Sequence, residues 1–141
     1  MINRPTGSFV DLSCRIPSAM RSEFGRVIEN LMDVPGSMGA VLVDDDGYAI
    51  DYVYDPEVMD SIDVELMGAQ VGQIVLRLLG SASKLDVGTP IALVESDPRN
   101  LMAGPVGEHY VLAFVMHRDT DAAQAFAHFE AVRSTVEHLL S

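Results

Sequence analysis

The sequence is short of cysteine and lysine and has no tryptophan. It contains one cysteine, Cys14, and one lysine, Lys84. A single cysteine cannot form an internal disulfide, which is typical of proteins in a reducing compartment. No apolar run approaches the roughly 18 residues of a transmembrane helix, and the first residues lack the apolar stretch of a signal peptide. We therefore expect a cytoplasmic protein without membrane insertion.

Basic residues are also scarce. The 141 residues include 9 Lys+Arg and 21 Asp+Glu, for a formal charge of −12. No lysine or arginine lies between Arg26 and Arg77, although that interval is rich in aspartate and glutamate. Such a surface repels the phosphates of nucleic acids and of anionic membranes. The charge opposes nucleic-acid binding, so we expect no nucleic-acid partner. Two explanations of the acidic interval remain, a basic protein partner or a solvated acidic surface.

The motifs of common catalytic and metal sites are missing. No cysteine pair and no HxxxH spacing would complete a zinc site with the four histidines. Neither a GxxxxGK phosphate loop nor a GxGxxG fingerprint is present. Asp44, Asp45 and Asp46 lack the later ligands of a calcium loop, because tyrosine and alanine follow Gly47 and the loop ends without glutamate. We expect no catalytic residues, no metal site and no cofactor.

The main feature that is present is an apolar helix expected over residues 60–79. At 100° per residue it has two apolar arcs on nearly opposite sides. One arc contains Val64, Met67, Val71, Ile74, Val75 and Leu78, and the other contains Val58, Ile62, Leu66, Ala69 and Leu76. Gly68 and Gly72 lie one turn apart, where a second backbone could approach. We predict that this helix packs on its own sheet and on a second molecule, with complete burial in a monomer as the alternative.

The rest of the chain alternates short apolar runs with turn residues. The pattern predicts a helix from the N-cap Ser18 to before Pro35, strands at 40–43, 48–54, 89–96, 101–106 and 110–117, a loop at 80–88, and a last helix capped by Thr120 or Asp121. The order α-β-β-α-β-β-β-α with hairpin-length links predicts an α+β domain over residues 18–141, in which helices sandwich an antiparallel sheet in three layers. Residues 1–17 are expected to form an N-terminal arm of unknown role, with a short strand or surface arm at 8–13.

Several of these segments, in this order, are similar to one known family. They are GAVLVDDDGYAI, MGAQVGQIVLRLLG, IALVES, PVG and YVLAFVM. Together they resemble the Roadblock/LC7 family of dynein light chain-like domains over residues 19–141. The resemblance implies a profilin-like fold, with a five-stranded antiparallel sheet that has one helix on one face and two on the other.

The resemblance also implies a homodimer. Members of the family pair their edge strands into one continuous sheet and place their central helices side by side. Transferred to this sequence, the edge strand is 89–96. The dimer interface is then expected at Ile62, Leu66, Gly68, Ala69, Gly72, Gln73, Leu76, Ile91 and Leu93.

Bacterial members of the family are non-catalytic partners of small Ras-like GTPases. The resemblance implies that role here, as a regulator of GTP hydrolysis or recruitment, and places GTPase binding at Met59, Asp60, Asp63 and Gln70. One alternative is a dimeric scaffold without a GTPase. Another is a PAS- or GAF-like ligand sensor, which the aliphatic strands disfavour because such a pocket needs convergent polar groups.

Overall fold

The computed structural model describes residues 22–86 and 88–141. The elements in chain order are α2 (Glu23–Ile28), the 3-10 helix η2 (Glu29–Asp33), β1 (Ser37–Asp44), β2 (Ala49–Tyr54), α3 (Ser61–Lys84), β3 (Ala92–Val94), β4 (Arg99–Val106), β5 (Tyr110–His117) and α4 (Ala122–Leu140). The expected helix start at Ser18 and the expected strand at 8–13 lie outside the described residues.

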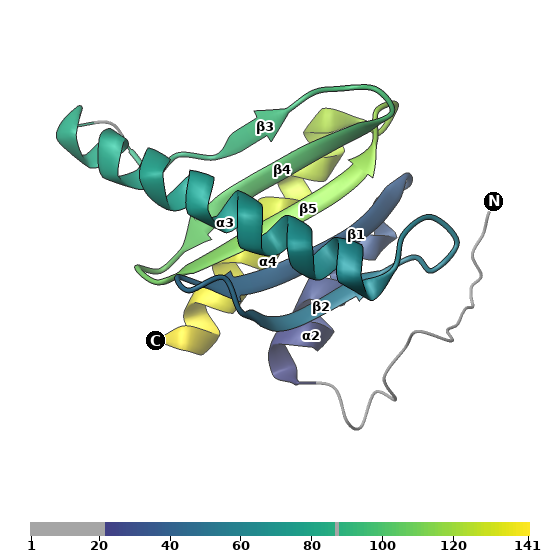
Figure 1. Ribbon diagram of the computed structural model, residues 1–141, viewed down its shortest axis with the longest axis horizontal. Coiled ribbons are helices and arrows are strands. Elements are labelled where there is room, and N and C mark those ends of the chain that lie inside the picture. The colour runs from purple at the N-terminus through teal and green to yellow at the C-terminus, as the bar shows by residue number, and fades with distance from the viewer. Residues whose placement is uncertain (1–21, 87) are drawn as a thin grey trace.

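The five strands form one antiparallel sheet in the order β2-β1-β5-β4-β3. β5 is central, and nearly every residue of β1 and β5 is buried, as expected of apolar runs that are covered on both faces. α3 crosses one face, while α2, η2 and α4 cover the other (Figure 1). The predicted three-layer α+β architecture is confirmed.

The two faces of the sheet hold two separate cores. Phe114 and Phe129 are fully buried in the core under α4. α4 begins at the N-cap Asp121, one of the two predicted caps, whose side chain accepts hydrogen bonds from two backbone N–H groups. Arg133 then ties α4 to the sheet, since its Nη1 donates to the Pro105 carbonyl at 2.8 Å while two other nitrogens bind Glu130. These contacts hold α4 on this face of the sheet.

α3 is longer than the sequence indicates. It continues to Lys84, so the prediction of a loop from Gly80 is wrong. Gly80 costs the helix about 1 kcal/mol relative to alanine, but the residues after it are compatible with a helix, and a positive φ of 58° at Asp86 follows its end. The last turns of α3 project beyond the sheet (Figure 1). No helix in the two described ranges is both long enough and apolar enough to cross a bilayer.

Other boundaries also differ from the prediction. The first helix tightens into the 3-10 geometry of η2. β3 has three residues instead of eight, because only Ala92–Val94 pair with β4 and Pro90 lacks the N–H that a ladder requires. β3 is nevertheless an edge strand, as Pro90 predicts. β1 and β4 both begin earlier than expected, at Ser37 and Arg99.

Candidate functional site

The side of α3 that faces the sheet is built from small residues. A Cβ placed on Gly68 would lie 2.7 Å from Val43 Cγ1 and 2.8 Å from Val41 Cγ1, and one on Gly72 would lie 3.0 Å from Val43 Cγ2. Both glycines are buried. They allow α3 to approach β1 of its own sheet, which corrects the expectation that they belong to a dimer interface.

One long side of α3 faces the turn between β1 and β2. Gln73 Nε2 donates to the Asp45 carbonyl at 3.3 Å, and a Cβ on Gly47 would lie 3.4 Å from the Cβ of Ala69. Leu76 is half-buried against the core under α3. Ala69, Gln73 and Leu76 therefore contact their own chain, although Gln73 is exposed and the other two are half-buried. Their place in a dimer interface stays a prediction. Their neighbours Ile62 and Leu66 remain exposed, by 70% and 54%.

The opposite long side of α3 faces β3. Here Ile74 is 57% and Leu78 41% exposed, while Met67 and Val71 are half-buried. Val94 of β3, 53% exposed, is on the same face of the sheet, because its cross-strand partner Leu101 packs into the core under α3. Met67, Val71, Ile74, Leu78 and Val94 are called the α3–β3 surface below.

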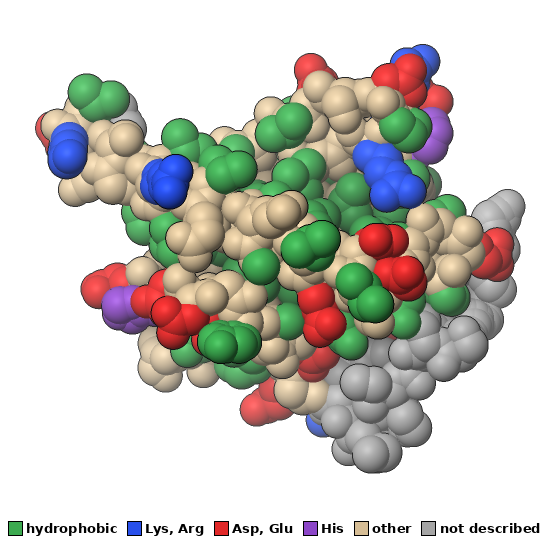
Figure 2. Space-filling model, viewed as in Figure 1, with side chains coloured by type: hydrophobic (Ala, Val, Ile, Leu, Met, Phe, Trp, Pro, Cys, Tyr) green, Lys and Arg blue, Asp and Glu red, His purple; other side chains and the backbone are tan. Residues whose placement is uncertain are grey.

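Figure 2 shows hydrophobic side chains along α3 and in the hollow between α3 and β3. The sequence assigned Ile74 and Leu78 to the arc covered by the chain's own sheet. The structure leaves both uncovered.

The predicted interface residues of β3 point to the other face of the sheet. Leu93 pairs with Met102, which is buried in the core under α4. Ile91 packs against the same core, and a Cβ on Gly104 would lie 3.3 Å from its Cγ1. Ile91 therefore packs within its own chain, whereas Leu93 remains partly exposed on the α4 side of the edge.

β3 is an edge strand with one free side. It pairs with β4, and its other side has no partner strand among the described residues. Unpaired N–H and C=O groups of an edge strand can pair with another chain. The α3–β3 surface and this edge are adjacent, so a partner that extended the sheet here would also cover Val94.

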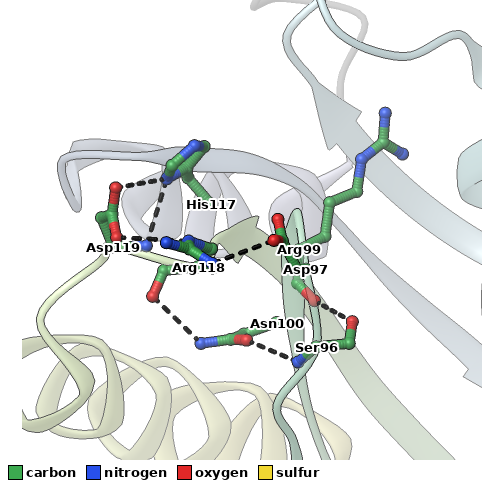
Figure 3. Close-up of polar contacts among 7 residues, drawn as sticks. All are labelled: Ser96, Asp97, Arg99, Asn100, His117, Arg118 and Asp119. Atoms are coloured by element: carbon green, nitrogen blue, oxygen red, sulfur yellow. Dashed lines mark hydrogen bonds and ion pairs between the residues drawn. The ribbon is translucent and has the colours of Figure 1, made fainter.

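Polar contacts fix the chain that follows β3 (Figure 3). Arg118 Nη1 binds Asp97 at 3.0 Å, and Asn100 accepts from the Ser96 N–H at 3.0 Å and donates to the Arg118 carbonyl at 3.4 Å. These contacts join the loop before β4 to the end of β5. They thereby fix the loop that follows the edge strand.

The start of α3 carries a complete capping box. Asp60 accepts a hydrogen bond from the Asp63 N–H at 2.8 Å, and Asp63 accepts from the Asp60 N–H at 3.4 Å. Both side chains are exposed, as is Gln70. Met59 is only 7% exposed and belongs to the core under α3. Met59 therefore lies beneath the predicted GTPase-binding surface and not on it.

A basic residue lies beside this acidic helix start. Arg99 is distant in sequence, but β4 brings it close enough for its Nη2 to donate to the Val58 carbonyl at 3.3 Å. In Figure 3 its side chain points away from the other six residues. The sequence offered no arginine between Arg26 and Arg77, and only the sheet topology reveals this neighbour.

The three consecutive aspartates shape the hairpin between β1 and β2. Oxygens of Asp44, Asp45 and Asp46 lie within 4.8 Å of one another. Asp44 Oδ1 accepts hydrogen bonds from the backbone N–H groups of Asp46 and Tyr48, and Gly47 has the positive φ of 89° that the turn requires. This is the predicted hairpin turn.

Comparison with known proteins identifies the fold. No protein-family model matches the sequence, and no curated protein matches it. Among solved structures, a Roadblock/LC7 domain from Streptomyces avermitilis is similar over 84% of this chain and 98% of its own, with a TM-score of 0.72 and 22% identity. The chain has the Roadblock/LC7 fold.

Other structures extend this result. Myxococcus xanthus MglB matches over 86% of this chain and 97% of its own, with a TM-score of 0.73 and 16% identity. Profilin II of Acanthamoeba castellanii matches over 82% of this chain and 96% of its own, with a TM-score of 0.53 and 12% identity. The Roadblock/LC7 fold of this chain is therefore also profilin-like, as predicted.

Proposed function

We propose that the protein is a non-catalytic regulatory partner of a small Ras-like GTPase and that it acts as a homodimer. The observation that carries the proposal is the α3–β3 surface, an exposed apolar strip of a helix beside the unpaired side of an edge strand. The likeness to MglB and the family resemblance of the sequence support the GTPase as the partner.

The exposed α3–β3 surface supports the proposed dimer. Two copies that pair their β3 edges continue the sheet and bring the β3-facing sides of their α3 helices together. Ile74, Leu78 and Val94 then lose contact with water. Fully burying an aliphatic side chain contributes about 1.5–3 kcal/mol, of which the cost of association takes back a part. The β1–β2 hairpin contacts Ala69 and Gln73 on the opposite side of α3, so we place the interface on the β3-facing side and not on the side that the sequence predicted.

The GTPase is proposed to bind at the start and outer side of α3. Asp60, Asp63 and Gln70 are exposed there, and the carboxylates are close together in the capping box. A basic patch on the GTPase would be attracted to this acidic surface. The role is regulation of hydrolysis or recruitment and adds no catalytic residue from this chain.

A nucleotide-dependent capture experiment tests the proposal. The purified protein is immobilised and incubated with lysate of its source cells in the presence of a GTP analogue or of GDP, and bound proteins are identified by mass spectrometry. We expect a small Ras-like GTPase to be retained much more strongly with one nucleotide. Recovery of structural proteins without any nucleotide dependence would contradict a GTPase regulator and favour a scaffold.

Charge-neutral variants locate the GTPase contact. In the Asp60→Asn and Asp63→Asn double variant, the new amide at the N-cap can still cap the helix, but two negative charges are removed. We expect at least a tenfold loss of captured GTPase. Glu108→Gln removes one exposed acid in the turn between β4 and β5, away from α3, and should capture as much as the unaltered protein. Equal losses in both variants would show that only overall charge matters.

A further inference from the structure

A second apolar surface borders the β3 edge, on the face of the sheet that α4 covers. Phe126 of α4 is 47% exposed and Leu93 of β3 is 43% exposed. By contrast Phe129, one turn further along α4, is fully buried. Phe126 and Leu93 are called the α4–β3 surface below, and the proposed contact between α3 helices does not involve them.

Phe126 lies on the side of α4 that is turned toward β3. His128, two residues later, lines the groove between α4 and the segment formed by α2 and η2, and α2 lies over β1 and β2 (Figure 1). At about 100° per residue, Phe126 points about 200° away from His128. It therefore faces away from α2 and toward the β3 edge.

Phe126 and Leu93 are also at the same level along the sheet. α4 and β4 run in the same direction, since the end of α4 accepts a hydrogen bond from the turn after β4. A Cβ on Gly104 of β4 would lie 3.5 Å from the ring of Phe129. Phe126 comes one turn, or about 5 Å, before Phe129, which brings it to the level of Met102. Met102 is the cross-strand partner of Leu93, so the two exposed side chains are neighbours.

The α3–β3 surface alone is small for a stable dimer. Fully burying an aliphatic side chain removes about 60–120 Å² of apolar area from water, and no side chain of that surface is more than 57% exposed. Its five side chains therefore offer at most about 350 Å². A stable interface buries about 800 Å² per partner, of which about 450–500 Å² is apolar. Phe126, an aromatic side chain that is half exposed, and Leu93 add about 100–150 Å², which makes up the difference.

β3 itself is apolar on both faces, because Leu93 points to the α4 side and Val94 to the α3 side. A strand that pairs with this edge meets both side chains, so it must also be apolar on both faces. The β3 strand of a second copy meets that requirement. We propose that the α4–β3 surfaces of two copies pack against each other in the dimer, so that the interface covers both faces of the joined sheet. The inference rests on the proposed dimer and adds Phe126 to it, whereas contact through α3 alone would leave Phe126 exposed.

Single-tryptophan variants test which faces the second copy covers. The chain has no tryptophan, so one introduced indole reports on one position. Phe126→Trp reports on the α4–β3 surface and Ile74→Trp on the α3–β3 surface. Tyr48→Trp, at the β1–β2 hairpin where the side chain is 71% exposed, is the control. Sedimentation gives the dimer fraction of each variant over a concentration series, and acrylamide quenching is measured in the same samples. We expect quenching to fall about twofold in the dimer for the first two variants and to stay constant for Tyr48→Trp.

The outcomes separate the inference from the dimer on which it rests. A dimer in which Ile74→Trp is protected and Phe126→Trp is not would overturn the inference and leave the dimer standing. Protection of Phe126→Trp alone would overturn the cover of both faces, because the copies would then meet on the α4 side only. A chain that stays monomeric at high concentration would overturn the inference together with the proposed dimer.

Charge substitutions give a second measurement. Phe126→Asp should raise the dissociation constant of the dimer at least tenfold, because an unpaired charge is unfavourable in a buried contact. Phe126→Leu keeps an apolar side chain and should change it less than threefold. Tyr48→Asp makes the same exchange of an exposed aromatic residue for a charge at the hairpin and should leave the dimer intact. Circular dichroism verifies that each variant is folded. Equal dissociation constants for folded Phe126→Asp and the unaltered protein would overturn the inference.

Discussion

The two long sides of α3 that flank its contact with the sheet differ in what covers them. On one side, Gln73 and Ala69 meet the hairpin of their own chain. Ile62 and Leu66, which neighbour them, are exposed. On the other side, Ile74 and Leu78 are apolar and about half exposed, and no turn of the described chain contacts them. Between these two sides, Gly68 and Gly72 face β1, where a larger side chain would not fit. An apolar pattern along a helix therefore indicates which sides can be buried. Side-chain size and neighbouring turns decide which of these sides is buried by the helix's own chain.

The largest expected effect separates these two sides. Ile74→Asp with Leu78→Asp places charges in the proposed interface, and burying an unpaired charge is strongly unfavourable. We expect dimerisation to weaken by at least 100-fold, or about 2.7 kcal/mol. Analytical ultracentrifugation over a concentration series measures the dissociation constant.

The matched control uses the exposed residues on the side that the sequence favoured. Ile62→Asp with Leu66→Asp makes the same chemical change on the same helix and should alter the dissociation constant by less than threefold. A dimer that survives the first pair and dissociates with the second would restore the predicted interface. An unaltered protein that stays monomeric at high concentration would contradict both interfaces, the one proposed from the structure and the one predicted from the sequence.

A smaller effect contrasts the buried and projecting parts of α3. Gly68→Ala pushes a methyl group into Val41 and Val43, and overpacking of this kind costs about 1–3 kcal/mol. Gly80→Ala makes the same change where nothing lies within 4 Å. That variant should stabilise the protein by about 0.5–1 kcal/mol, through helix propensity.

Urea denaturation at a fixed protein concentration compares the free energies of unfolding. The essential result is that the two substitutions change the free energy of unfolding in opposite directions. Stabilisation by both variants would show that α3 can move away from β1 without cost, and destabilisation by both would show that Gly80 is covered, for example by a second molecule on the projecting turns.

Much of the fold could be predicted because its signals are local. The uninterrupted apolar runs of β1 and β5 indicate strands covered on both faces, and an Asp-Gly turn indicates a hairpin. The candidate site was harder. Helical periodicity gives the angles between residues but not the rotation of the helix on its sheet. Gly68 and Gly72 were therefore assigned to the wrong partner, and Ile74 and Leu78 to the covered side.

Contacts between segments that are distant in the chain could not be predicted from the sequence either. Arg99 lies near the start of α3 only because β4 begins there. Met59 resembles a surface residue before a helix, yet the loop after β2 carries it under α3, where its sulfur lies 3.0 Å from the position of a Cβ on Gly39. Both placements depend on sheet topology, which no local pattern encodes.

The smallest expected effect concerns the start of α3. Asp60→Ala removes the acceptor of the Asp63 N–H and should cost about 1 kcal/mol of stability. Asp60→Asn keeps an acceptor and should cost only a few tenths of that. Asp121→Ala, at the N-cap of α4, provides a reference on the opposite face and should be similar to Asp60→Ala in thermal or urea denaturation.

These variants also separate capping from binding. A loss of GTPase capture in Asp60→Asn, at nearly unchanged stability, would assign the charge of Asp60 to the partner. A loss in Asp60→Ala alone would mean that binding requires an ordered first turn of α3 and not its charge. Because Asp121→Ala destabilises the protein without touching α3, undiminished capture by that variant would exclude a general effect of lower stability.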